Sequence, residues 1–295
     1  MNLLNPHKIC SVIITYNPDH LLLDIINIIE NQVDKIIIID NNSEGQGLEI
    51  ISKIAENHKL CLLRNKENGG IAKALNQGVE LAKKMDYEWA LTFDQDTKPF
   101  DNIIEIISEV YALYSDKQKI GAIGVNFSNF KSESYYPITG RNKYHERDYI
   151  ITSGCLLSVN AFYKIGGFRE DFFIDNVDLE YSLRLKRYGK VSLITKKWGM
   201  SHKVGDPRTK RCLGLNLVSS NHTSLRRYYM ARNHIILSKD YFFINPYFIG
   251  KANFFFLKSL IQILLVETNK KAKIIASLKG IIDGIFYSAK YKKIL

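Results

Sequence analysis

Short apolar runs alternate with amphipathic stretches over the first hundred residues. The runs are rich in β-branched residues, which is typical of buried strands, and they lie at 9–15, 33–39, 60–63 and 89–93. The stretches between them place apolar side chains three and four positions apart, which predicts helices at 21–32, 48–57 and 71–85. This alternation predicts an α/β fold, with a mostly parallel central sheet and helices on both faces.

Polar loops follow three of these predicted strands. They begin at Tyr16, at Asp40 and at Asp94, and the second continues through Gly45 and Gly47. Ligands of such sheets bind beyond the carboxyl ends of the strands, and parallel strands bring those ends to one edge. The three loops therefore predict one ligand site at that edge.

Beyond residue 100 the pattern is weaker. It predicts strands at 120–126, 150–159 and 191–194, the last strand of the chain, and helices at 102–114, 160–165 and 178–188. Residues 128–148 are polar, aromatic and basic, which indicates a loop region facing substrate or solvent. From about residue 215 the sequence is helical, amphipathic and basic. We therefore expect a main domain at 1–215 and a helical region at 216–295.

The net charge of +11 implies an acidic partner, which leaves nucleic acid, an anionic membrane or a phosphorylated substrate. Lysines concentrate in the last fifty residues and favour a membrane surface. No apolar run reaches about 18 uninterrupted residues, so we expect no transmembrane helix, and the N-terminus lacks the pattern of a signal peptide. The four cysteines are isolated, which favours a reducing, cytosolic compartment.

Two carboxylates, Asp94 and Asp96, stand one residue apart at the end of an apolar run. Positions two apart on a strand point the same way, so both can face one site. Converging carboxylates repel each other unless a cation lies between them, and a divalent metal carrying a diphosphate suits that position. An Asp-rich turn is the structural alternative.

Asn68-Gly69-Gly70 precedes a predicted helix. Glycine lets the backbone approach a ligand closely, and a helix N-terminus suits phosphate. A simple glycine turn explains the same residues. The chain has neither a G-x-G-x-x-G nor a Walker A pattern here, which disfavours dinucleotide and ATP binding.

Asp178 lies at the start of a predicted helix, after an aromatic-rich approach. It can cap that helix, or it can act as a general base that takes a proton from an acceptor hydroxyl. Asp175 is the second choice for the base. His202 follows the last predicted strand and can complete a metal site with the two aspartates, although a lone histidine is more often structural.

Cations and aromatic residues are mixed at 226–234. This mixture suits single-stranded nucleic acid or a phosphate-bearing, membrane-bound acceptor. Lysines alternate with apolar residues at 270–293, as in helices that lie on anionic lipid, whereas an ordinary packed helical appendage is the alternative.

Taken together, these residues resemble the inverting family 2 glycosyltransferases of GT-A fold, most closely their rhamnosyltransferase branch. The matching segments appear in the family's order, and they are 12–18, 39–43, 65–72, 91–97, 166–168 and 177–184. The resemblance covers about residues 9–235. Two departures from the family pattern are Asn41, where a second acidic residue is usual, and Val177, where Glu is usual.

The resemblance implies a role for each candidate residue. The donor nucleotide would lie against Thr15, Tyr16, Asn17, Asp40, Asn41, Asn68, Gly69, Gly70 and Asp94. Asp94, Asp96 and His202 would hold Mn²⁺ or Mg²⁺ on the diphosphate, and Asp178 would be the base. The acceptor and membrane side would include Arg226, Arg227, Tyr228, Tyr229, Arg232 and Asn233.

The favoured hypothesis is a metal-dependent sugar transferase that uses dTDP-rhamnose and a lipid-linked acceptor in the synthesis of cell-surface polysaccharide. Its expected place is the cytoplasmic face of the membrane, as a peripheral protein, with no nucleic acid partner. The alternatives are a UDP-sugar donor such as UDP-galactofuranose, and, from another class, a basic nucleic-acid-binding module. A nucleotidyltransferase is disfavoured because residues 9–19 lack a glycine- and lysine-rich phosphate loop. The oligomeric state stays open.

Overall fold

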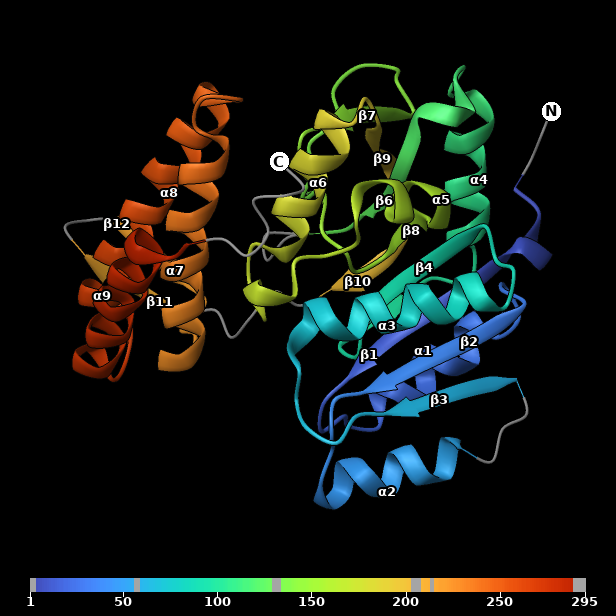
Figure 1. Cartoon of the computed structure of the whole chain (residues 1–295), viewed down its shortest axis with the longest axis horizontal. Helices are drawn as coiled ribbons and strands as arrows, with labels where there is room; N and C mark the ends of the chain where they lie inside the picture. Colours follow the sequence, from blue (N-terminus) through green and yellow to red (C-terminus); the bar gives the residue numbers. More distant parts are fainter. Residues whose placement is uncertain (1–3, 56–58, 129–133, 203–207, 213–214, 289–295) are drawn as a thin grey trace. The chain divides into compact units, whose positions relative to one another are not determined.

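The computed structural model describes residues 4–55, 59–128, 134–202, 208–212 and 215–288, and it describes no side chain between 203 and 218 (Figure 1). The chain divides into two compact units. The first contains Met1–Asp171 and Asp178–Lys203, and the second contains Phe172–Val177 and Val204–Leu295. The predicted domain boundary at residue 215 stays a prediction.

The first unit is built on an eight-stranded sheet in the order β3-β2-β1-β4-β8-β6-β9-β7. Its strands are β1 (Ile9–Thr15), β2 (Lys35–Asp40), β3 (Leu60–Arg64), β4 (Trp89–Asp94), β6 (Ile120–Asn126), β7 (Tyr144–Arg147), β8 (Cys155–Ser158) and β9 (Val191–Trp198). The first four run parallel, whereas β8 is antiparallel to both of its neighbours and β7 is antiparallel to β9. The predicted α/β fold with a mostly parallel sheet is confirmed.

Helices lie on both faces of this sheet (Figure 1). They are α1 (Leu21–Ile29), α2 (Gly45–Ile54), α3 (Gly70–Lys84), α4 (Ile103–Leu113), α5 (Val159–Ile165) and α6 (Val177–Arg187), with 3₁₀ turns at Pro6–Lys8, Lys117–Lys119 and Glu170–Phe172. A small antiparallel pair joins β5 (Thr97–Pro99) to β10 (Met200–His202).

The core of this unit lies around β1, all seven residues of which are buried. A strand covered by helices on both faces needs a continuous apolar run, which is what the sequence provides. Helix α3 approaches β1 closely at Gly78, where a Cβ atom would lie 2.2 Å from a Val12 methyl carbon. Close helix packing therefore fixes α3, and with it the loop at its N-terminus.

Several sequence predictions of secondary structure were wrong in detail. Helix α2 begins at Gly45, inside the predicted loop. The helix was predicted to begin only at residue 48, because Gly45 and Gly47 are poor helix formers. Strand β7 lies inside the predicted loop 128–148; it is an edge strand without a continuous apolar run. The strand predicted to be the last is followed by three more, one of which spans Leu215–Ser219 in the region predicted as helical.

The second unit contains the hairpin β11 (Arg208–Cys212) and β12 (Leu215–Ser219) and the helices α7 (Ser224–Tyr241), α8 (Pro246–Leu265) and α9 (Lys270–Phe286). Helices α7 and α9 pack closely at Gly280, where a Cβ atom would lie 2.3 Å from the Tyr228 carbonyl oxygen. Among the described residues, α8 is the one helix whose length and apolar composition are sufficient to cross a membrane.

Candidate active site

Three loops of the predicted site leave the same edge of the sheet. The parallel register pairs Thr15 with Asp40 and Ile14 with Asp94, so the strand ends lie level with one another. The Thr15 hydroxyl donates a hydrogen bond to Asp40 Oδ1 over 3.1 Å. The structure therefore brings together the loops that the sequence predicted to be neighbours.

Asp40 is fully buried and holds the second loop in shape. Its carboxylate accepts hydrogen bonds from the Ser43 backbone N–H, over 3.0 Å, and from the Ser43 hydroxyl, and it lies 3.4 Å from Arg64 Nε. A buried carboxylate needs such partners. Neither Ser43 nor Arg64 was among the residues predicted for the site.

The neighbouring Asn41 links this loop to the start of α3. Its side-chain amide donates to the Gly70 carbonyl oxygen over 3.2 Å, and its oxygen accepts from Asn65 over 2.9 Å. Gly70 has φ +85°, a left-handed conformation that suits glycine, and its N–H donates to Asn68 Oδ1. Asn68, Gly69 and Gly70 thus join the same edge, and which of Asp40 and Asn41 contacts a base stays a prediction.

Gln95, between the two aspartates, ties the first loop to the third. Its side chain accepts from the Tyr16 N–H over 2.6 Å and donates to the Tyr16 carbonyl oxygen over 3.0 Å. Asn17 joins the first loop to the second, because its backbone N–H donates to Ser43 Oγ and its side chain accepts from the Glu44 N–H. Gln95 was not predicted as a site residue, since a reciprocal pair of hydrogen bonds across 79 residues leaves no local pattern.

Two of the three predicted metal ligands, Asp96 and His202, lie near each other because the β5–β10 pair sets His202 opposite Thr97. His202 Nδ1 lies 2.6 Å from the Thr97 hydroxyl and 3.9 Å from Asp96 Oδ1. Burial lowers the pKa of His202, although the charge of Asp96 acts in the opposite direction. The Thr97 contact fixes the ring, as the outer partners of metal-binding histidines do.

The residues present fit a metal ion that takes only some of its ligands from the protein and the others from a bound substrate and water. Among the described residues no three His, Cys, Asp or Glu side chains converge to hold an ion by themselves. Asp96 and His202 nevertheless offer a carboxylate and an imidazole close together, and Asp94 lies two residues before Asp96. Mg²⁺ and Mn²⁺ accept a few protein ligands when phosphate oxygens and waters supply the rest.

Asp178 lies in the first turn of α6, where Tyr149 contacts it. The Tyr149 hydroxyl donates to Asp178 Oδ2 over 3.1 Å, and the Leu179 N–H donates to Oδ1 over 2.8 Å. Burial raises the pKa of Tyr149 well above its ordinary value, and the charge of Asp178 adds to this effect. The phenol therefore stays protonated and orients the carboxylate.

One irregular segment, residues 149–153, contacts both the predicted base, Asp178, and the loop that carries the predicted metal ligands Asp94 and Asp96. Tyr149 binds Asp178 at one end. At the other end, Ser153 Oγ accepts from the Asp94 N–H over 3.0 Å and donates to the Thr97 hydroxyl over 2.7 Å. Both residues were missed by sequence reasoning, because a tyrosine and a serine in an irregular segment match no motif.

In the second unit, Asp175 forms an ion pair with α7. Arg226 Nε lies 3.1 and 3.0 Å from the two carboxylate oxygens of Asp175, and a terminal guanidinium nitrogen lies 3.0 Å from Oδ1. Asn233 and Tyr229 contact the same segment, 172–177. Of the other predicted residues there, Arg227 pairs with Glu267, the Tyr228 hydroxyl donates to Asp283, and Arg232 lies over the Tyr229 ring.

A mostly parallel sheet of this kind, with acidic loops at one edge, is characteristic of GT-A glycosyltransferases. The chain belongs to glycosyl transferase family 2, whose model matches residues 10–172, more than half of its length. It is an enzyme that transfers hexosyl groups.

Comparison with known proteins supports this assignment. The chain is 31% identical to the dTDP-rhamnosyl transferase RfbF of Shigella flexneri, over 94% of this chain and 95% of that protein. In fold it is similar to S. aureus TarS 1-349, with a TM-score of 0.61 and 14% identity over 94% of this chain and 81% of that one. It also resembles GalNAc-T7 solved with UDP, GalNAc and Mn²⁺, with a TM-score of 0.58 and 13% identity over 77% of this chain and 47% of that one.

Proposed function

We propose that this enzyme transfers rhamnose from dTDP-rhamnose to a hydroxyl group of a lipid-linked glycan in cell-surface polysaccharide synthesis. The observation that carries the proposal is the similarity to a dTDP-rhamnosyl transferase along nearly the whole chain. The edge formed by Thr15, Asp40 and Asp94 supports a nucleotide donor. The family membership favours an enzyme over the nucleic-acid-binding module that the charge alone allowed.

In the proposed reaction, Asp178 takes the proton of the acceptor hydroxyl. The acceptor oxygen forms a bond to the anomeric carbon while the bond from that carbon to the diphosphate oxygen breaks, so one displacement inverts the configuration. Tyr149 keeps Asp178 oriented by donating to its Oδ2 atom. Asp178 is preferred to Asp175, because Arg226 already engages both carboxylate oxygens of Asp175.

Asp94, Asp96 and His202 are the residues that would hold a divalent cation on the donor. When bound, Mn²⁺ or Mg²⁺ neutralises charge on the departing diphosphate. The chain's own contribution is to hold the Asp94 backbone through Ser153 and the His202 ring through Thr97.

We further propose that the second unit places the enzyme on the cytoplasmic face of the membrane. Support comes from an apolar outer face on α8 and α9 with large exposed side chains, namely Tyr247, Phe254, Phe255, Leu257, Ile261, Leu264, Ile275, Leu278, Ile282 and Ile285. Lysines flank these residues, as in helices that bind anionic lipid. A position on the membrane would keep the enzyme where a lipid-linked acceptor is found.

The donor is tested by thermal shift with dTDP-rhamnose, UDP-galactofuranose and UDP-GlcNAc, each with Mn²⁺, Mg²⁺ or EDTA. Because a ligand stabilises the folded state by mass action, dTDP-rhamnose with metal should raise the Tm most. Asp178→Asn should keep this shift and lose about 100- to 10,000-fold in kcat, the usual contribution of a general base. A larger shift with a UDP-sugar would replace the proposed donor.

A further inference from the structure

The segment 172–177 has an unusual backbone. Phe173, Asp175 and Asn176 have φ values of +59°, +65° and +59°, although none of them is glycine. A left-handed conformation is uncommon outside glycine, and for a bulky residue such as Phe it is a clear outlier. Such a conformation persists only where surrounding contacts impose it, and it is common at functional sites.

Helix α7 supplies these contacts through one asparagine. Asn233 is fully buried, and its side-chain nitrogen lies 2.8 to 2.9 Å from the carbonyl oxygens of Phe172, Ile174 and Asp175. Three carbonyl oxygens at one point require a donor, and an asparagine amide provides it. A carboxylate of the same size would place an acceptor against three acceptors.

Two further contacts from α7 hold the same segment. Arg226 binds both oxygens of Asp175, and Tyr229 stacks on Phe173 with ring centroids 4.9 Å apart. One face of the helix therefore engages the backbone, the charge and the ring of a segment of six residues.

We propose that Asn233, with Arg226 and Tyr229, positions the catalytic base. The segment leads directly into α6, where Asp178 is the second residue, so its conformation sets where that helix begins. This inference rests on the proposed role of Asp178. It gives these α7 residues a positioning role in place of direct contact with the acceptor.

The test compares Asn233→Asp with Asn253→Ala. Asn253 accepts hydrogen bonds from His234 and Ser238 of α7 but is not bonded to residues 172–177 in the structure, so it is a matched control. Asn233→Asp should lower kcat by about 10- to 100-fold, since small misplacements of reacting groups have effects of that size. The KM for the donor should stay within about twofold of wild type, because the loops at Tyr16, Asp40 and Asp94, where we propose that the donor binds, are unchanged.

Hydrogen exchange provides a readout that is independent of turnover. In Asn233→Asp, the peptide covering 172–178 should exchange much faster than in wild type, whereas Asn253→Ala should leave it unchanged. If Asn233→Asp fails to fold, Arg226→Gln is tested in its place, and it should likewise lower kcat and speed the exchange of 172–178. An unchanged kcat in an active enzyme, or unchanged exchange, overturns the proposal.

The two hypotheses fail in different ways. If wild type transfers no sugar from any donor but the exchange of 172–178 still depends on Asn233, the proposed function is wrong and the segment has no base to position. If wild type is active and the Asn233 variant matches it, the enzyme assignment stands and the positioning role is overturned.

Discussion

At the scale of single residues, the orientation of Asp178 depends on a phenol that is remote in sequence. Tyr149 lies 29 residues before the carboxylate and donates to its Oδ2 atom. Asp178 itself was predicted from its place at a helix start, which is a local pattern. Its partner was not, because a contact between an irregular segment and a helix depends on the folded chain.

Tyr149→Phe should therefore lower kcat by about tenfold, the effect of losing one hydrogen bond to a charged group. The donor KM should not change, because the hydrogen bond described for Tyr149 goes to Asp178 and not to the loops at Tyr16, Asp40 and Asp94. The matched control is Tyr163→Phe, which removes a hydroxyl from a tyrosine that is 47% exposed. Steady-state kinetics on both variants checks this, and equal kcat values would show that the phenol has no role in orienting the base.

At the scale of helices and strands, the buried central strands were predictable from the sequence and the edge strand β7 was not. Residues 9–15 are buried on both faces of the sheet, so their apolar run identified β1 correctly. Strand β7 is half-exposed at the end of the sheet, so it carries no such run. The ends of β1, β2 and β4 lie together because these strands pair in parallel. This explains why the meeting of their three loops was predicted and the α7 contacts to 172–177 were not.

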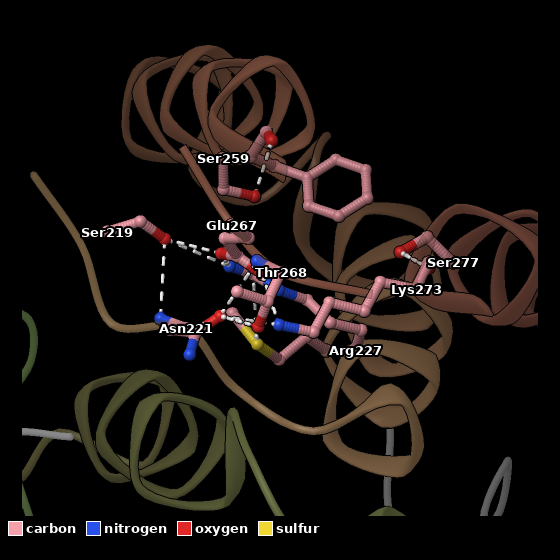
Figure 2. Close-up of polar contacts among 10 residues, drawn as sticks. Ser219, Asn221, Arg227, Ser259, Glu267, Thr268, Lys273 and Ser277 are labelled. Atoms are coloured by element: carbon pink, nitrogen blue, oxygen red, sulfur yellow. Dashed lines mark hydrogen bonds and ion pairs between the residues drawn. The ribbon is translucent and has the colours of Figure 1, made fainter. Parts of the chain in front are cut away.

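Helices α7 and α9 and the turn between α8 and α9 meet at a buried carboxylate, Glu267 (Figure 2). It accepts hydrogen bonds from Arg227 and Ser219, and Lys273 Nζ lies 3.0 Å from its Oε2. Burial acts to raise the pKa of Glu267, but these hydrogen bonds outweigh it and lower the pKa. One carboxylate thus neutralises part of the charge of two buried cations.

Glu267→Gln should destabilise the protein by about 3 to 5 kcal/mol, because it leaves Arg227 and Lys273 buried without a counter-ion. Urea denaturation measures this as a lower midpoint. Asp148→Asn is the control, since its pair with Lys186 is largely exposed and should be worth less than about 1 kcal/mol. Equal losses in the two variants would mean that the buried cluster is not important for stability.

The turn before α7 contains His222, which is expected to make stability depend on pH. Burial lowers the pKa of His222 to about 4, and Arg226, Arg227 and Lys273 add to this effect while Glu267 opposes it. As pH falls through 6.5 the unfolded chain gains a proton on this residue, whereas the folded chain does so only near pH 4. Stability should therefore fall with pH in this window, by up to about 3 kcal/mol.

The measurement is the Tm from pH 7 to pH 4.5 for wild type and His222→Gln. The variant should show a shallower decline, because it removes the proton uptake of the unfolded state at this position. His20→Gln, a change at an exposed histidine, should follow wild type. Parallel curves for wild type and His222→Gln would contradict the role of His222.

At the scale of the whole molecule, the sequence predicted both the sheet and a basic, amphipathic C-terminal part. It did not identify which side of each helix is left uncovered, since that depends on packing within the unit. Helix α8 directs Ile249, Ile263 and Asn253 inward, where Asn253 meets His234 of α7. Phe254 and Leu257 are 65% and 59% exposed on its outer face. A face of this kind suits a partner that tolerates large apolar groups, and we have proposed anionic lipid.

Vesicle co-sedimentation tests this surface. The double variant Phe254→Ser with Leu257→Ser should bind vesicles containing phosphatidylglycerol at least about tenfold more weakly, since burying each of these side chains is worth 1.5–3 kcal/mol. The matched control is Phe100→Ser with Leu113→Ser, which changes the same two residue types at exposed positions of the first unit and should bind like wild type. Binding should also weaken as salt rises, because lysines supply part of the attraction. If both double variants bind alike, or if the α8 variant instead loses self-association in light scattering, the outer face is not a lipid surface.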